Sequence, residues 1–248
     1  MKQYYEFITP MGTMRGFFHK PDVSMFPVCL VFHGFTGQKT GTKFSYVQLA
    51  RMLEKQNIGT IRLDFLGTGE SDLEFKDMTF DDELTCARLL LEEVLKMSST
   101  KEVYVLGHSM GGVIASELAK AYPNQIKKMC LWSPAFNLPN ALHYLVGKML
   151  PNEKGIYDHN GFEISQKFVD TLLHKDFYKD LNIFQNELLV IHGENDETVP
   201  YEISNRYLVA FHNRLTFIPI PEGTHNFDNI EDIKKVLISS IQFLCDSY

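Results

Sequence analysis

A serine stands between closely spaced glycines in the segment Gly107-His108-Ser109-Met110-Gly111, which has the pattern G-x-S-x-G. The apolar run Val103 to Leu106 precedes this segment, and the helix-forming run Val113 to Leu118 follows it. Glycines two residues before and after a serine permit the tight, strained turn that exposes a serine between a strand and a helix. Free N–H groups and the positive end of the helix dipole favour an alkoxide there. We therefore predict that Ser109 is a nucleophile.

A serine nucleophile also needs an imidazole as base and a carboxylate that orients the imidazole. After an elbow of this type, the acid precedes the histidine in the chain. Three acids, Glu194, Asp196 and Glu197, follow the apolar run Leu188 to Ile191. Asp196 is favoured because a short carboxylate in the loop before Val199-Pro200 can orient an imidazole, while Glu194 and Glu197 stay as alternatives.

Two histidines, His212 and His225, follow Asp196 in the chain. His212 comes before the last apolar run, Leu215 to Ile218, and so at the wrong end of a strand for catalysis. His225 comes after that run. We predict that it is the general base, which takes the proton of Ser109 in acylation and returns one to the leaving group.

A second glycine-containing loop, His33 to Gly37, follows the apolar run Val28 to Phe32. Such a loop can direct the backbone N–H of Phe35 at the carbonyl oxygen that the N–H of Met110 also reaches. The two donors would form an oxyanion hole. His33 either takes part in this site or is a packing residue that shapes the loop.

Short apolar runs alternate with helical patterns along most of the chain. The runs are Val28 to Phe32, Thr60 to Leu63, Val103 to Leu106, Met129 to Trp132, Leu188 to Ile191 and Leu215 to Ile218. Continuous apolar runs are typical of strands buried on both faces. Two helical patterns are Leu84, Ala87, Leu91, Val94 and Leu95, with Thr79 as N-cap, and Ile230, Ile233, Leu237, Ile241 and Leu244. The alternation predicts an α/β fold with a mostly parallel sheet and helices on both faces.

Two stretches depart from this alternation. Residues 1 to 20 contain strand-like stretches, Tyr4 to Ile8 and Thr13 to Phe18, which predict an antiparallel hairpin at one sheet edge. Residues 133–181 carry several prolines, glycines and aromatic residues and are too long for a plain loop. We predict that they form a small inserted cap over the carboxyl ends of the strands, within a single domain of residues 1–248.

Composition restricts the partners and the compartment. The net charge of −7 argues against nucleic acid and anionic membrane surfaces, and no apolar run is long enough to insert into a membrane. No secretory signal is visible at the N-terminus, and four cysteines without C-x-x-C spacing favour a reducing cytoplasm. The predicted chemistry needs no metal and no organic cofactor, only a small-molecule ester. Homodimer formation stays open.

At these residues the chain resembles the bacterial cinnamoyl or feruloyl esterases of the α/β-hydrolase superfamily. The resemblance covers nearly the whole length. It rests on the elbow, the insertion, and the segments His33 to Thr36, Arg62 to Asp72 and Asp196 to Pro200. It implies a cytoplasmic carboxylesterase whose insertion shapes a pocket for the acyl group.

By this resemblance, Ser109, Asp196 and His225 would be the triad, with Phe35 and Met110 as backbone oxyanion donors. Two positions depart from the pattern of those esterases. Those esterases commonly carry glutamine where this chain has Met110, and a methionine at this position is frequent in monoacylglycerol lipases. Thr68 stands where such families usually place histidine.

The sequence is compatible with more than one acyl group and more than one function class. Hydrolysis of a cinnamoyl or feruloyl ester is the first hypothesis. A monoacylglycerol lipase or a thioesterase for aliphatic chains is the alternative that Met110 and the apolar insertion suggest. A ligand-binding receptor with a hydrolase-like site and slow turnover is an alternative from another class. The residues of the insertion that would bind the substrate are not identified.

Overall fold

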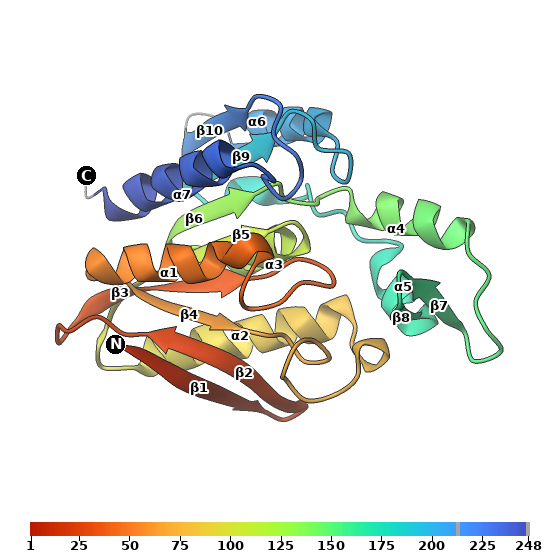
Figure 1. Ribbon diagram of the computed structural model, residues 1–248, viewed down its shortest axis with the longest axis horizontal. Helices are drawn as coiled ribbons and strands as arrows, with labels where there is room; N and C mark the ends of the chain where they lie inside the picture. The colour runs from red at the N-terminus through yellow and green to blue at the C-terminus, as the bar shows by residue number, and fades with distance from the viewer. Residues whose placement is uncertain (212–213, 247–248) are drawn as a thin grey trace.

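Eight strands form one sheet in the computed structural model, which describes residues 1–211 and 214–246 (Figure 1). The strands are β1 Lys2–Thr9, β2 Gly12–His19, β3 Phe26–Phe32, β4 Gly59–Leu63, β5 Thr100–His108, β6 Ile126–Trp132, β9 Glu187–Gly193 and β10 Leu215–Ile220. Their order is β1-β2-β4-β3-β5-β6-β9-β10, and all neighbours from β4 to β10 are parallel. The predicted α/β fold with a mostly parallel sheet is confirmed.

The N-terminal hairpin is confirmed at one edge of this sheet. β1 and β2 pair antiparallel with Lys2 opposite His19 and Thr9 opposite Gly12, and β2 pairs antiparallel with β4. The Thr9 hydroxyl donates a hydrogen bond to the Gly12 carbonyl at 2.8 Å and accepts one from the Gly12 N–H at 3.2 Å. These local bonds close the tight turn and so fix the register of the hairpin.

Helices cover both faces of the sheet (Figure 1). They are α1 Ser45–Lys55, α2 Phe80–Lys96, α3 Met110–Ala121, α4 Leu138–Gly147, α5 Gln166–Leu172, α6 Ser204–Phe211 and α7 Ile230–Cys245. Strand β5 shows why the apolar runs lack alternation: Val103 and Val105 face the core under α2 and α3, while Tyr104 and Leu106 face the core under α1 and α7. Both faces of the strand are therefore buried.

Helix α2 begins where the sequence predicts. The Thr79 hydroxyl accepts a hydrogen bond from the Asp82 N–H at 3.1 Å, and the Asp82 carboxylate accepts one from the Thr79 N–H at 3.1 Å. This reciprocal capping box satisfies two N–H groups at the helix start.

Residues 133–181 leave the sheet after β6 and return before β9. They contain α4, a separate hairpin of β7 Ile156–His159 and β8 Phe162–Ser165, and α5, and a 3₁₀ turn, Leu181–Ile183, follows. In Figure 1 these elements extend from one end of the sheet. Within the described part of the chain, no helix has the length and apolar character needed to cross a membrane.

Candidate functional site

The turn from β5 into α3 has the strained geometry that the glycine spacing predicts. Ser109 has φ 56° and ψ −122°, values that side-chain-bearing residues rarely adopt. A Cβ on Gly107 would lie 2.1 Å from the Gly111 carbonyl oxygen, and one on Gly111 would lie 2.2 Å from that of Phe32. Neither position can carry a side chain. The two glycines therefore let the backbone turn sharply at Ser109.

Backbone hydrogen bonds hold Ser109 in this conformation. Its N–H donates to the Trp132 carbonyl of the neighbouring strand at 2.9 Å. Its carbonyl accepts from the N–H of Gly112 at 3.0 Å and from that of Ala135 at 3.1 Å. Bonds to the first turn of α3 and to the stretch from Trp132 to Ala135 thus fix the backbone at this residue.

The loop after β3 lies against the serine. A Cβ placed on Gly34 would come within 2.9 Å of the Ser109 Cβ and 3.5 Å of its Oγ. Phe35 follows Gly34, and Met110 follows Ser109 as the first residue of α3. The structure therefore brings the residues that directly precede the two predicted oxyanion donors into contact with each other.

His33 is a buried residue that supports this loop. Its Nε2 accepts a hydrogen bond from the Phe65 N–H at 3.0 Å, so the proton of the neutral ring is on Nδ1, which donates to the Gly34 carbonyl at 2.9 Å. Burial lowers the pKa of His33. Of the two interpretations of His33, the packing residue that shapes the loop is the one that these contacts favour.

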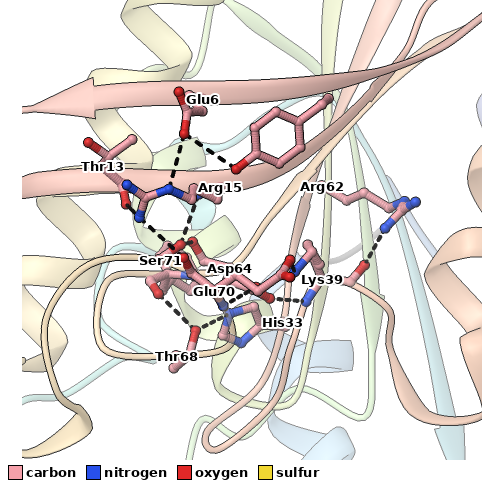
Figure 2. A network of polar contacts seen from close by, with 12 residues as sticks. Glu6, Thr13, Arg15, His33, Lys39, Arg62, Asp64, Thr68, Glu70 and Ser71 are labelled. Carbon is pink, nitrogen blue, oxygen red and sulfur yellow. Dashed lines mark hydrogen bonds and ion pairs between the residues drawn. The ribbon is translucent and has the colours of Figure 1, made fainter.

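A buried network joins the same loop to the segment after β4 (Figure 2). The Asp64 carboxylate accepts hydrogen bonds from the Lys39 N–H at 2.7 Å and from the Glu70 N–H at 2.9 Å. Lys39 Nζ lies 2.5 Å from Asp64 Oδ2, and Arg62 Nη1 donates to the Lys39 carbonyl at 3.2 Å. Asp64 and Arg62 are almost completely buried. The network fixes the far end of the loop that begins at His33.

Asp196 and His225 meet at the carboxyl ends of β9 and β10. His225 Nδ1 lies 2.7 Å from Asp196 Oδ2. The other oxygen, Oδ1, accepts hydrogen bonds from the N–H groups of Thr198 at 2.9 Å and Val199 at 2.7 Å. Burial opposes the ionisation of Asp196, but hydrogen bonds from His192 and His225 outweigh it and lower the pKa of the carboxyl below its usual range. The carboxylate is therefore ionised and held in a fixed orientation.

The alternative residues do not take this position. Glu194 and Glu197 are exposed on the same loop, whereas the Asp196 side chain is fully buried. His212, the other histidine downstream of Asp196, lies outside the described residues.

Sequence reasoning missed His108, which connects the elbow to the histidine loop. Its Nε2 donates to the His225 carbonyl at 3.0 Å, and the two imidazole centroids are 5.1 Å apart. Burial, reinforced by the neighbouring His225, lowers the pKa of His108 to about 3, so the ring is neutral. Its position directly before the predicted nucleophile was the available signal. His108 brings the His225 loop next to Ser109.

His192 is the second residue that the sequence did not reveal. It is completely buried at the end of β9, and its Nε2 lies 2.9 Å from the Val199 carbonyl oxygen and 3.2 Å from Asp196 Oδ2. The signal in the sequence was limited to its spacing, four residues before Asp196, after an apolar run.

Aromatic side chains connect the inserted segment to the loop that carries Phe35. The Phe35 ring lies 5.2 Å from Phe168 of α5 and 6.1 Å from His159 of β7, measured between centroids. The Phe35 ring also lies 5.3 Å from Phe75, which in turn is 5.2 Å from Phe162 of β8.

Two ion pairs also join the inserted segment to the rest of the chain, Lys76 to Glu163 at 3.0 Å and Asp81 to Lys175 at 2.7 Å. The insertion thus packs directly on the loop beside Ser109.

The arrangement contains the parts of an acyl-transfer site. Ser109, at a helix N-terminus, lies beside a glycine loop, and the His225 imidazole, with its ionised carboxylate partner, contacts His108, the residue before Ser109. Such a set can deprotonate a hydroxyl, stabilise a tetrahedral oxyanion and protonate a leaving group.

Comparisons with known proteins indicate the family and the fold of the chain. A family model described as serine aminopeptidase, S33, matches residues 24–157, which is more than half of the chain. Lipase 1 of Psychrobacter immobilis is 31% identical over 156 residues, which are 60% of this chain and 44% of that protein. A monoglyceride lipase homolog of Monkeypox virus is 28% identical over 256 residues, covering 88% of this chain and 89% of that protein. The chain spans less than half the length of the first of these relatives.

Among solved structures, Est1E from Butyrivibrio proteoclasticus with bound ferulic acid superposes with a TM-score of 0.87. The match covers 98% of this chain and all of Est1E at 24% identity, so it bears on the fold. The chain therefore belongs to the serine aminopeptidase S33 family and has the α/β-hydrolase fold.

Proposed function

We propose that the chain hydrolyses carboxylic esters through an acyl-enzyme on Ser109, with His225 as general base and Asp196 as the acid that orients it. The observation that carries this proposal is the 2.7 Å contact between His225 Nδ1 and Asp196 Oδ2, in a loop bonded to the residue before Ser109. That contact requires a proton on Nδ1, so Nε2 of the neutral ring is free to accept one.

The reaction follows from these groups. Ser109 Oγ attacks the ester carbonyl carbon while His225 takes its proton, and the backbone N–H groups of Phe35 and Met110 stabilise the oxyanion. When the tetrahedral intermediate collapses, the bond to the alcohol breaks and His225 protonates the departing oxygen. Water, deprotonated by His225, then attacks the acyl-enzyme, which releases the acid and restores Ser109.

We further propose that residues 133–181 act as a cap and that the acyl group is aromatic, as in cinnamoyl or feruloyl esters. Phe35, which carries one proposed oxyanion N–H, contacts Phe75 and Phe168, so an acyl group held at that N–H lies next to aromatic rings. Such rings favour stacked or edge contacts with a planar aryl group. The similarity along the whole chain to Est1E, which binds ferulic acid, supports the same substrate class.

An aliphatic acyl group is the second candidate, because the similarity to the monoglyceride lipase homolog extends over most of both proteins. These functions can be separated by measuring kcat/KM on matched acetyl, octanoyl and feruloyl esters and on an aminoacyl peptide. The Ser109→Ala protein serves as the blank. The highest kcat/KM on the feruloyl ester is the expected result. Preference for octanoyl esters would reject the aromatic substrate class. Full ester turnover by Ser109→Ala would reject the mechanism, and one acylation per chain without turnover would indicate a receptor.

A further inference from the structure

His192 is a buried imidazole that the mechanism above does not use. Its Nε2 donates a hydrogen bond to the Val199 carbonyl at 2.9 Å, so Nε2 carries a proton, and Asp196 Oδ2 lies 3.2 Å from the same nitrogen. Its Nδ1 is buried and has no hydrogen-bond partner among the described residues. A buried ring nitrogen without a hydrogen-bond partner destabilises the folded state, so the favourable polar contacts of this histidine are those of Nε2.

The two imidazoles lie against the same carboxylate oxygen. His225 Nδ1 lies 2.7 Å from Asp196 Oδ2, and His192 Nε2 lies 3.2 Å from that atom. A second N–H on an oxygen disperses its negative charge, so the carboxylate attracts the imidazolium form of His225 less strongly. The hydrogen bonds from the Thr198 and Val199 N–H groups go to Oδ1, so the Nε2–H of His192 is the second polar group that lies close to the oxygen facing His225.

We propose that His192 is a positioning residue that sets the proton affinity of His225 by sharing Oδ2 of Asp196 with it. This inference rests on the proposed triad. By holding Oδ2 from the β9 side, His192 keeps the carboxylate aimed at Nδ1. By dispersing its charge, His192 lets His225 lose its proton at a lower pH, so a larger fraction of the base is active in mildly acidic solution.

The other ionisable groups around the two imidazoles stay the same when His192 alone is replaced. They are His108 and the Lys43–Asp228 pair beside His225, and Tyr201, whose ring centroid lies 5.7 Å from that of His192. His108 is neutral over the working range, and its bond to the His225 carbonyl does not involve the His192 side chain. A change in the titration of His225 therefore reports on the His192 donor.

Two amide variants form a matched pair for the test. Gln places its Nε2 donor at about the reach of the imidazole Nε2, whereas the amide of Asn corresponds to the Nδ1 position and falls short of Asp196. The variants His192→Gln and His192→Asn are made in the Ser109→Ala background, and the ring protons of His225 are titrated by NMR. In the Ser109-containing proteins, the pH profile of kcat/KM is measured with 4-nitrophenyl acetate.

In His192→Asn we expect the midpoint of the His225 titration, and the acid limb of kcat/KM with it, to rise by about 0.5 to 1 pH unit. His192→Gln is expected to keep the wild-type midpoint. An unchanged or lower midpoint in the Asn variant, or an equal rise in both variants, would overturn the proposal. If the Asn variant does not fold by circular dichroism, His192→Phe, which keeps a ring and removes the donor, replaces it under the same criteria.

The titration needs no turnover. If wild type hydrolyses no ester while the His225 midpoint still responds to His192, the proposed function fails and the coupling stands. If esters are hydrolysed and the midpoint does not respond, the coupling alone fails.

Discussion

Lys39 Nζ lies 2.5 Å from Asp64 Oδ2, and the backbone N–H of Lys39 donates to the other oxygen of that carboxylate at 2.7 Å. One acid therefore binds both the charge and the main chain of the same residue. Because Lys39 follows the loop His33 to Gly37 by two residues, this double contact holds the end of the loop that carries Gly34 and Phe35.

Removing the charge of Lys39 leaves Asp64 ionised and buried without its partner. We expect Lys39→Met to lower the free energy of unfolding by on the order of 3 kcal/mol, with a loss of kcat, since the loop is no longer fixed. Urea denaturation and ester kinetics measure both. Glu70→Gln is the control, because the Glu70 side chain is 70% exposed and its contact with Lys39 should contribute less than about 1 kcal/mol. Equal effects of the two substitutions would contradict this prediction.

The backbone strain at Ser109 has a measurable cost. We expect Ser109→Gly to be more stable than Ser109→Ala by about 1 kcal/mol, because glycine relieves a strain of about 1–3 kcal/mol but gains entropy when unfolded. Both variants lack the hydroxyl, so chemical denaturation compares them without any effect of activity. A less stable glycine variant would show that the strain at the positive φ of 56° is smaller than the entropy cost of glycine and so would contradict this prediction.

Glu83 makes stability depend on pH. It is buried in the first turn of α2, one oxygen has no hydrogen-bond partner among the described residues, and burial, with Asp82 nearby, raises the pKa of Glu83 to about 8. The folded state keeps this proton above pH 4.5 while the unfolded state releases it. Stability should therefore fall between about pH 5 and 8, with a limiting slope on the order of 1.4 kcal/mol per pH unit.

Glu83→Gln is expected to remove this slope, so the variant gains stability relative to wild type as the pH rises from 5 to 8. Denaturation curves at three pH values test it. Glu93→Gln, at an exposed position of the same helix, is the control and should follow the wild-type curve. A constant difference between Glu83→Gln and wild type at all three pH values would refute the raised pKa.

Phe75 and Phe162 connect the inserted segment to the loop after β4, with ring centroids 5.2 Å apart. In a double-mutant cycle of Phe75→Leu and Phe162→Leu we expect a coupling free energy of about 1 kcal/mol in unfolding. Pairing Phe75→Leu with Tyr4→Leu, on the far edge strand, should give a coupling near zero. Strictly additive effects of the first pair would show that the contact does not stabilise the segment.

Much of the fold follows from the sequence because its signals are local. The continuous apolar runs predict the six parallel strands, and Thr79 with Asp82 predicts the start of α2, since a cap depends on residues three apart. Asp196 and His225 are foreseeable because parallel strands bring their carboxyl ends to one edge. Their 2.7 Å contact agrees with this expectation, whereas the roles assigned to them stay predictions.

Contacts between distant segments were not visible in the sequence. His108 bonds to His225 across 117 residues, and Asp64 binds Lys39 between two loops; nothing in the local pattern of either histidine or acid specifies the partner. The predicted apolar run ends at Ile191, whereas β9 extends through His192 to Gly193, and nothing in the local sequence of His192 specifies the groups that its imidazole contacts.

Both ends of the described chain lie near the end of the sheet at which the parallel strands begin, opposite the elbow at Ser109. Lys2 pairs with His19 near the start of β4, and the Phe243 carbonyl near the end of α7 accepts a hydrogen bond from Lys128 at the start of β6. In Figure 1 the inserted segment extends from the other end of the molecule. A linker to a solid support, joined at either end, would therefore hold the protein with its Ser109 face toward the bulk solution, so that attachment and access of small molecules do not compete for the same surface.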